Sequence, residues 1–202
     1  MNIRHYLFIG LSLWALSSCS EADEEDPEWA NWKQRNELYF EEQYAGHYVE
    51  TSTSFVIPSW GMPSETTADL PHTSYILVDV IESAVGGDDE LSPLYSDSVS
   101  VNYSGRLMPS DSYPKGYEFD RSWLNVYDPD VDVPYTLAVN GGVVEGFSTA
   151  LQYMHRGDKW RVTMPYQLGY GSTDRSGIPA YSTLVFEIEL IDFWSKKKGD
   201  RL

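Results

Sequence analysis

Short runs in which apolar and polar residues alternate restrict the fold of this chain more than any other feature. In the run Asp97–Leu107, the side chains of Val99, Val101 and Tyr103 fall on one face, as expected for a half-buried strand. Five further runs read as strands: Ser74–Glu82, Gly116–Asp120, Pro134–Val139, Gly157–Tyr166 and Thr183–Phe193. Runs of this kind, separated by turn residues, predict an antiparallel sheet.

Only one helix is evident among these runs. The segment FSTALQYMHRG places Phe147, Leu151 and Met154 on one face and ends at Gly157. One short helix among antiparallel strands indicates an α+β domain over residues 74–194, in which a half-open antiparallel β-sheet wraps around the helix.

An aromatic helix is predicted before this domain. Asp26-Pro27 is a typical helix start, aromatic residues then recur at helical spacing, and Gly46 is a suitable C-cap. The aromatic face packs either on the domain or on a second copy of the chain, which would give a homodimer. Residues 51–73 show little periodicity and are predicted to be a connecting loop, so residues 27–73 form a helix-and-linker extension.

The first 18 residues, 1–18, resemble a lipoprotein signal peptide. Arg4 precedes an apolar run from Tyr6 to Leu16, and small residues then lead to Cys19, the single cysteine of the chain. The sequence LSSC resembles a bacterial lipobox, which implies cleavage before Cys19 and lipidation of its thiol; an ordinary signal peptide with a chance cysteine is the alternative. We therefore expect a lipid-anchored protein of the cell envelope, at the periplasmic or surface face of the outer membrane.

The charge balance of the chain excludes one class of partner. There are 31 acidic and 14 basic residues, and a net charge of -17 argues against nucleic-acid binding. Residues 19–26 form an acidic tether that resembles a surface-export signal of Bacteroidetes lipoproteins, or else serves as a solvated spacer. Residues 195–202 are a short basic tail.

The common catalytic and metal-binding templates do not fit. His47, His72 and His155 have no metal-ligand spacing, and the single cysteine is assigned to lipid attachment. The series DPDVD begins like a calcium loop but lacks the required glycine and terminal glutamate, so a solvated acidic loop is the better interpretation. The sequence predicts neither a metal nor a cofactor.

Four segments together resemble the signatures of FKBP-type peptidyl-prolyl cis-trans isomerases. They are VNYSGRL, YEFDRS, GGVVEGFSTALQYMHRGDKWRVTMPYQLGYG and IPAYSTLVFEIELIDF, in this order within residues 74–194. The resemblance implies an enzyme that isomerises Xaa-Pro bonds of exported polypeptides without a cofactor and that can bind macrolide inhibitors. A non-catalytic FKBP-like binding or chaperone module on a lipid anchor is the alternative.

The resemblance also implies which residues form the site. Asp120, Tyr170 and Phe119 are expected to be catalytic, with the Tyr170 hydroxyl donating a hydrogen bond to the substrate carbonyl. Seven residues are expected to line the proline pocket: Tyr103, Tyr135, Val143, Val144, Phe147, Ile178 and Phe186.

The residue set suits the chemistry of isomerisation. An Xaa-Pro bond isomerises slowly because amide resonance sets a barrier of about 20 kcal/mol, but no bond is broken. An apolar aromatic cup therefore stabilises the twisted, less dipolar amide without a nucleophile or metal. The glycine-punctuated loop Leu168–Pro179 would then serve this cup and not a phosphate.

Some positions depart from the family pattern. Tyr135 stands where a Phe is usual, Phe147 where a Trp is usual, and Gly142 where an acid is common. The loop between Asp120 and Tyr135 is longer than usual, and its aromatic residues Trp123 and Tyr127 are expected to extend the binding face.

Overall fold

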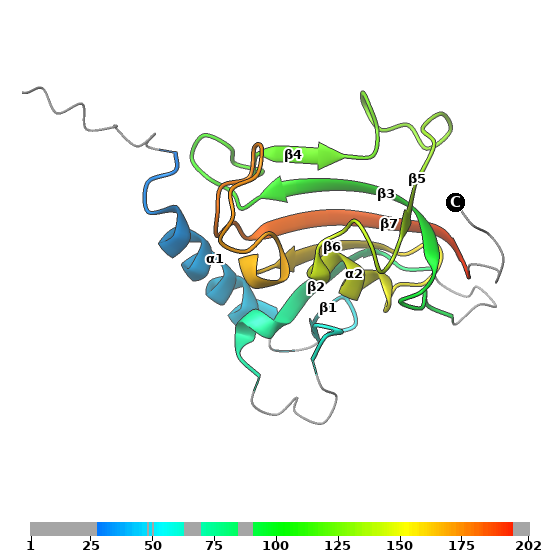
Figure 1. Ribbon diagram of the computed structural model, residues 1–202, viewed down its shortest axis with the longest axis horizontal. Helices are drawn as coiled ribbons and strands as arrows, with labels where there is room; N and C mark the ends of the chain where they lie inside the picture. The colour runs from blue at the N-terminus through cyan, green and yellow to red at the C-terminus, as the bar shows by residue number, and fades with distance from the viewer. Residues whose placement is uncertain (1–27, 48, 50, 63–69, 85–90, 196–202) are drawn as a thin grey trace, which may run out of the picture.

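An antiparallel sheet of seven strands forms the body of the molecule (Figure 1). The computed structural model describes residues 28–47, 49, 51–62, 70–84 and 91–195 of the chain. The strands are β1 Ser54–Pro58, β2 Tyr75–Glu82, β3 Ser98–Leu107, β4 Glu118–Arg121, β5 Tyr135–Ala138, β6 Lys159–Met164 and β7 Leu184–Trp194. The helices are α1 Trp32–His47 and α2 Glu145–Leu151, with short 3-10 turns η2 His72–Ser74 and η3 Tyr166–Leu168.

Strand β3 connects the two parts of the sheet. The strand order is β1-β2-β6-β7-β3-β4, and β5 also pairs with β3. One edge of β3 pairs along its length with β7, while its other edge is divided between β5 at one end and β4 at the other. This arrangement, with α2 against the sheet, confirms the predicted α+β fold with a half-open antiparallel sheet.

The predicted strands form because their alternating apolar side chains reach a common core. Val99 and Val101 of β3 are fully buried, and β7 alternates buried Leu184, Ile188 and Leu190 with partly exposed neighbours. A half-buried sheet requires this two-residue period. All six strands expected from the sequence are present, and their ends differ from the prediction by only a few residues.

Helix α2 is shorter than predicted. The helix was expected to end at Gly157, but it ends at Leu151, because the amides of Tyr153 and Met154 both turn back to the Ala150 carbonyl. The chain is then redirected onto the sheet, where the Gly157 amide donates to the Leu190 carbonyl over 2.7 Å.

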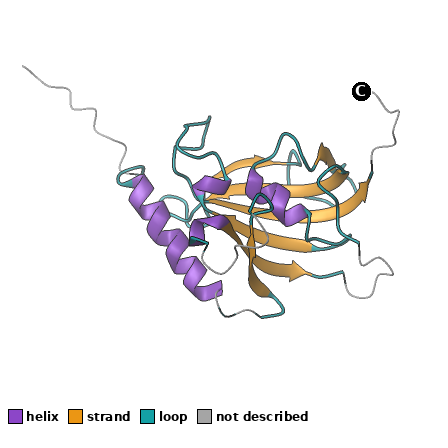
Figure 2. Cartoon of the chain, turned by 60° about the horizontal axis from the view of Figure 1, so that its bottom comes forward, coloured by secondary structure: helices purple, strands orange, loops and turns teal. Residues whose placement is uncertain are grey.

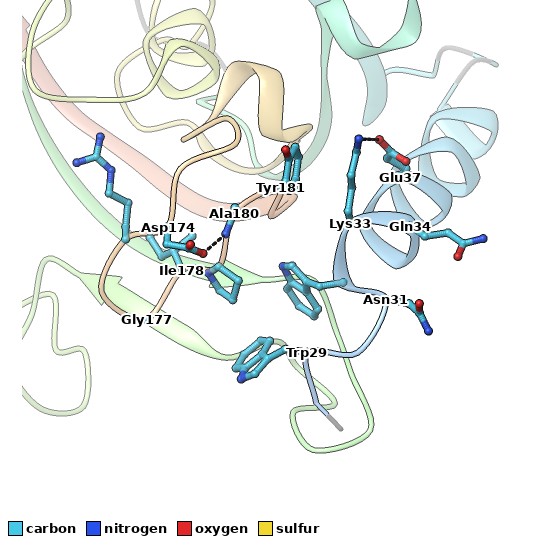
Figure 3. A pocket seen from close by; sticks show the side chains of 13 residues that line it. Trp29, Asn31, Lys33, Gln34, Glu37, Asp174, Gly177, Ile178, Ala180 and Tyr181 are labelled. Carbon is cyan, nitrogen blue, oxygen red and sulfur yellow. Dashed lines mark hydrogen bonds and ion pairs between the residues drawn. The ribbon is translucent and has the colours of Figure 1, made fainter. Parts of the chain in front are cut away.

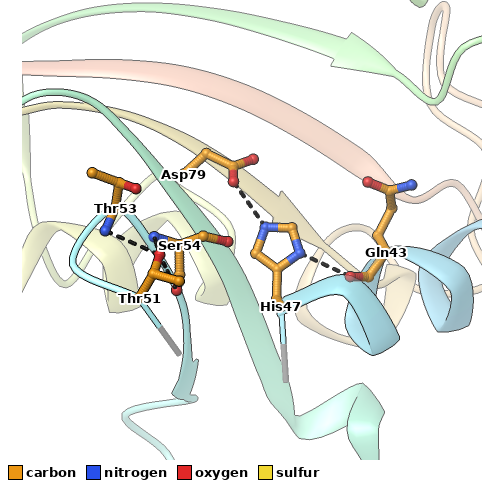
Figure 4. A network of polar contacts seen from close by, with 6 residues as sticks. All are labelled: Gln43, His47, Thr51, Thr53, Ser54 and Asp79. Carbon is orange, nitrogen blue, oxygen red and sulfur yellow. Dashed lines mark hydrogen bonds and ion pairs between the residues drawn. The ribbon is translucent and has the colours of Figure 1, made fainter. Parts of the chain in front are cut away.

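Helix α1 exists as predicted, but both of its predicted ends are wrong. It begins at Trp32, because Asn31 adopts a left-handed conformation (φ 53°) and the residues just before it form a turn; Asp26 and Pro27 lie outside the described residues. It continues through Gly46 to His47, whose Nδ1 lies 2.8 Å from the Gln43 carbonyl oxygen and whose Nε2 lies 3.0 Å from Oδ1 of Asp79 (Figure 4). The contact with strand β2 thus fixes the end of the helix.

Helix α1 packs on its own domain, and α1 and α2 lie on opposite faces of β2. Ile76 and Val78 belong to the core that includes α2, whereas Leu77 packs with Phe40 and Tyr44 of α1. Successive side chains of a strand point to opposite faces, so β2 is covered on both. Figure 2 shows the long helix α1 along the side of the sheet, apart from the short α2.

The predicted connecting loop 51–73 contains a strand. Residues Ser54–Pro58 form β1 and pair in antiparallel register with β2. The run SFVIP is short and ends in proline, which is tolerated at the outer edge of a sheet where no further strand pairs. Because the run is so short, its alternation pattern did not predict a strand.

The proposed signal peptide, Cys19 and the basic tail from Lys196 on lie outside the described residues. Within the part of the chain that the structure describes, no helix combines the length and apolar composition needed to cross a bilayer.

Candidate functional site

A pocket of about 370 Å³ lies where α2 meets β3, β5 and β7. Its floor is the ring of Phe147, which is 3 % exposed and stands nearly perpendicular to the rings of Tyr103 and Phe186, at centroid distances of 5.6 and 5.2 Å. Edge-to-face contacts of this kind are favourable and fix the orientation of each ring. The result is an apolar cup with rigid aromatic walls.

Two tyrosine hydroxyls and one carboxylate stand at this cup. The Tyr103 hydroxyl donates a hydrogen bond to Oδ2 of Asp120 over 2.9 Å, and the Arg121 amide donates to Oδ1 of Asp120 over 2.9 Å. Tyr170 lines the same pocket from the segment after β6. Each of the two carboxylate oxygens of Asp120 therefore accepts one hydrogen bond.

The electrostatics of the pocket keep both phenols protonated. Burial raises the pKa of Tyr103 well above its usual range, and the hydrogen bond to Asp120 and the charge of that carboxylate add to the shift. Burial and then the charge of Asp120 raise the pKa of Tyr170, while the Arg175 guanidinium partly offsets this. Each phenol is thus a hydrogen-bond donor at neutral pH.

The structure brings most of the predicted site residues together. Eight of the ten line this pocket: Asp120, Tyr170, Tyr103, Tyr135, Val143, Val144, Phe147 and Phe186. The other two do not line it. Phe119 packs behind the wall, with its ring 5.6 Å from that of Phe186 and nearly perpendicular to it, and Ile178 is buried beside a separate groove next to α1.

Sequence reasoning missed Gly105, which lies beneath the cup. A Cβ atom at this position would lie 2.6 Å from Cε1 of Phe186 and 2.7 Å from Cε2 of Phe119. Only glycine lets both rings approach the strand this closely. The signal was available in the sequence, because an isolated glycine inside a strand often marks such an approach.

The long loop after Asp120 does not extend the pocket as expected. The Tyr127 hydroxyl donates to Oε2 of Glu189 over 2.7 Å and accepts from Nδ2 of Asn102 over 2.9 Å. Asn102 is the neighbour of Tyr103 in β3, so its side chain points to the opposite face of the sheet. Trp123 packs on Tyr127 there, at a centroid distance of 5.0 Å.

The side chain of Arg121 also turns away from the pocket. Its Nη1 lies 3.1 Å from Oε1 of Glu118, and its Nη2 donates to the Leu124 carbonyl. Among the described residues, the partners of the Asp120 carboxylate are therefore the Tyr103 hydroxyl and a backbone amide, not a basic side chain.

Comparison with the sequences of known proteins finds relatives of this chain. The chain is 34 % identical over 121 residues to the macrophage infectivity potentiator of Trypanosoma cruzi and 33 % identical over 125 residues to the FKBP-type peptidyl-prolyl cis-trans isomerase FkpA of Escherichia coli K12. These alignments cover 59 % and 62 % of this chain, but only 55 % and 40 % of those proteins. The chain thus spans about half the length of the curated relatives that it matches.

Solved structures give the same result. The crystal structure of FkpA from Escherichia coli matches with a TM-score of 0.54 and 26 % identity, covering 81 % of this chain and 62 % of that one. A peptidyl-prolyl cis-trans isomerase from Pseudomonas syringae also matches with a TM-score of 0.54, at 25 % identity, covering 85 % of this chain and 99 % of that one.

The family model for FKBP-type peptidyl-prolyl cis-trans isomerases matches residues 91–191, which include the whole pocket. Because this match covers half of the 202 residues and agrees with the fold, the chain belongs to the FKBP-type peptidyl-prolyl cis-trans isomerase family.

Proposed function

We propose that the protein is a peptidyl-prolyl cis-trans isomerase that acts on Xaa-Pro bonds of exported polypeptides through this pocket, within a domain over residues 74–194. The observation that carries the proposal is the placement of Tyr170 and Asp120 at the mouth of an aromatic cup that has Phe147 as its floor. A buried core needs neither a carboxylate nor phenol donors at such a position.

The reaction requires only differential binding of a twisted amide. The proline ring enters the cup, where Phe147, Tyr103 and Phe186 exclude water from it. Tyr170 donates its hydroxyl hydrogen to the substrate carbonyl and holds it while the C–N bond rotates. Since the rotating amide loses its resonance and becomes less dipolar, an apolar surround favours it over the planar ground state.

Asp120 has a positioning role at the rim in this proposal. Its oxygens are held by Tyr103 and by the Arg121 amide, so the carboxylate keeps one orientation when substrate arrives. If the cup, Tyr170 and Asp120 together lower the rotational barrier by about 4 kcal/mol, isomerisation is accelerated about a thousandfold.

A protease-coupled isomerisation assay tests the function. It uses the full-length chain in mild detergent and a four-residue peptide with an apolar residue before proline. Wild type is compared with Tyr170→Phe and Asp120→Ala; the matched control is Tyr153→Phe, at a tyrosine that is 48 % exposed and does not line the pocket. Acceleration that falls in the first two variants and persists in the control supports the proposal. No acceleration by folded wild type contradicts it and leaves a non-catalytic binding module.

Macrolide binding is proposed for the same pocket. The apolar lining supports it, while the Phe147 floor in place of the usual Trp alters the contact surface. Inhibition of the assay by a macrolide at micromolar concentration, competitive with peptide, is the expected outcome.

We also propose that residues 1–18 are removed and that Cys19 is lipidated, which would anchor the chain to the outer membrane through the acidic tether 19–26. The LSSC sequence after an apolar run supports this. Cys19→Ser is expected to move the protein into the soluble fraction and to abolish labelling by radioactive palmitate; retention of the label would contradict the anchor.

A homodimer through α1 stays a prediction. Trp32, Phe40 and Tyr44 are buried against the chain's own domain, so a second copy would meet the outer face of the helix, where Leu38 is 63 % exposed. Light scattering of wild type and Leu38→Glu tests it: a monomer for both proteins would exclude this dimer.

A further inference from the structure

A groove of about 890 Å³ lies between the beginning of α1 and the loop 174–181 (Figure 3). Trp29 and Ile178 lie on its two sides, with Lys33 of α1 and Tyr181 of the loop farther along it. Both walls combine apolar and charged side chains. The groove is larger than the proline pocket and exists only because the N-terminal extension packs beside this loop.

Both walls are fixed by specific contacts. On the helix side, the Trp32 indole N–H donates to Oγ of Ser182 over 2.9 Å, and the Trp29 ring stands perpendicular to that of Trp32 at 4.9 Å. On the loop side, the Ala180 amide donates to Oδ1 of Asp174 over 2.7 Å. Lys33 connects the two walls, since its Nζ lies 4.8 Å from the centre of the Tyr181 ring.

The groove is separate from the proline pocket, and a single side-chain contact relates the two. Arg175 lines the groove, and its guanidinium carbon lies 5.7 Å from the centre of the Tyr170 ring, which lines the pocket. Ile178, which family resemblance assigns to the pocket, lines the groove instead. A peptide bound in the pocket beside Tyr170 therefore has Arg175, at the near end of the groove, as its neighbour.

The charges of the groove indicate what it can bind. Lys33 pairs with Glu37 inside the groove, with its Nζ 3.8 Å from Oε1 of Glu37. Arg175, in contrast, pairs with no carboxylate among the described residues and lies against the Tyr170 ring. In a chain of net charge -17, an unpaired guanidinium beside an apolar wall is a preferred place for a carboxylate. The partly exposed ring of Trp29 lines the same groove and offers an aromatic surface to a second ring.

We propose that this groove is an accessory subsite for the polypeptide substrate, which binds a segment outside the isomerised Xaa-Pro unit carrying an aromatic side chain next to a carboxylate. The inference rests on the proposed function, because it assigns the groove to the same substrate. It gives the N-terminal extension a role in selecting sequences beyond the proline.

Peptides of different length test the subsite. The short substrate has four residues and fills only the pocket. The long substrates have roughly twelve residues, which at about 3.3 Å per residue reach past Arg175. They carry Trp-Asp on the amino side or on the carboxyl side of the proline, and a third peptide carries Gly-Asn at both places.

The proteins compared are the full-length wild type, Trp29→Ala, Lys33→Glu and the control Leu38→Ala, whose side chain is exposed on the same helix but does not line the groove. With wild type, one of the two Trp-Asp peptides is expected to exceed the Gly-Asn peptide about tenfold in kcat/KM. Trp29→Ala and Lys33→Glu should remove most of that advantage and leave the short peptide unchanged. Leu38→Ala should behave as wild type.

Fluorescence anisotropy of the labelled Trp-Asp peptides gives a readout that is independent of activity. Equal binding of all three long peptides to wild type, or equal binding of the Trp-Asp peptide to wild type and both groove variants, would overturn the subsite. Absence of turnover of the short peptide would instead contradict the proposed function. Thermal unfolding checks each variant, and if Trp29→Ala does not fold, the exposed Lys33→Glu decides the question.

Discussion

The hydroxyl of Tyr103 donates a hydrogen bond to Oδ2 of Asp120 over 2.9 Å, across the two paired strands β3 and β4. Tyr103 is also in edge-to-face contact with Phe147, the floor of the cup. One side chain therefore connects the apolar floor to the polar rim. A change at Tyr103 should affect the orientation of Asp120 while leaving the aromatic floor in place.

Tyr103→Phe is expected to lower kcat/KM about fivefold, because the carboxylate loses one of its two fixed partners. A hydrogen bond of this kind contributes about 1 kcal/mol, which corresponds to roughly that factor. The ring contact with Phe147 is retained, so the urea midpoint should fall by little. Tyr153→Phe is the matched control. Unchanged kcat/KM in Tyr103→Phe would show that the hydrogen bond has no part in positioning Asp120.

The tyrosines predict how stability depends on alkaline pH. The pKa values of Tyr103 and Tyr170 are raised in the fold, chiefly by burial, and burial with the hydrogen bond to Glu189 raises the pKa of Tyr127 to about 12. The unfolded chain releases these phenolic protons near pH 10, so the stabilisation is fully present below that pH and is lost as pH rises towards the folded values. These groups should therefore make a constant contribution to the free energy of unfolding in urea between about pH 7 and 9. Their contribution should fall above about pH 10.

Variants of the tyrosines identify which groups cause the loss of stability above about pH 10. Tyr127→Phe should flatten the decline without altering isomerisation, because Tyr127 lies on the sheet face away from the pocket. Tyr170→Phe should also flatten it, but should reduce activity as well. A decline that is the same in wild type and both variants would contradict the assignment.

The sequence predicted six of the seven strands and the presence of α2, though not its end, because the periodic burial that stabilises these elements is local in sequence. Val99 and Val101 are fully buried as alternation predicts. The strand β1 was missed because its five residues gain their stability from pairing with β2, a partner that local pattern does not reveal. The C-terminal end of α1 was missed for the same reason, since Asp79 of another strand contacts His47 there.

The candidate site shows the same division. Pocket residues such as Phe147 and Tyr170 were identified through family motifs, and they line one cavity. The expectation that Tyr127 extends the binding face was wrong. Its hydroxyl is held by Glu189 and Asn102, which are remote in sequence. The groove beside Ile178 could not be predicted at all, since it arises where α1 meets a loop about 140 positions later in the chain.

Gly105→Ala is expected to disrupt the cup from beneath. The added methyl group would lie 2.6 Å from Phe186 and 2.7 Å from Phe119, so both rings must move. Overpacking of this kind costs about 1–3 kcal/mol and should displace the pocket wall. We expect a clear loss of activity and a lower urea midpoint. Gly141→Ala, at a pocket glycine where a Cβ atom meets nothing within 4 Å, is the control and should stay near wild type.

Asn36→Ala is expected to weaken the attachment of α1 to the domain more than any exposed substitution on the helix. Asn36 is fully buried; its Oδ1 accepts from the Thr183 amide over 2.7 Å, and its Nδ2 donates to the Trp32 carbonyl over 2.8 Å. Removing the side chain leaves the Thr183 amide buried without this partner, which costs about 1–3 kcal/mol. Urea unfolding measures the loss, with the exposed Leu38→Ala as control. If α1 only covers the sheet, both variants will unfold alike; if Asn36 fastens the helix, its variant will unfold at lower urea while keeping activity on the four-residue peptide.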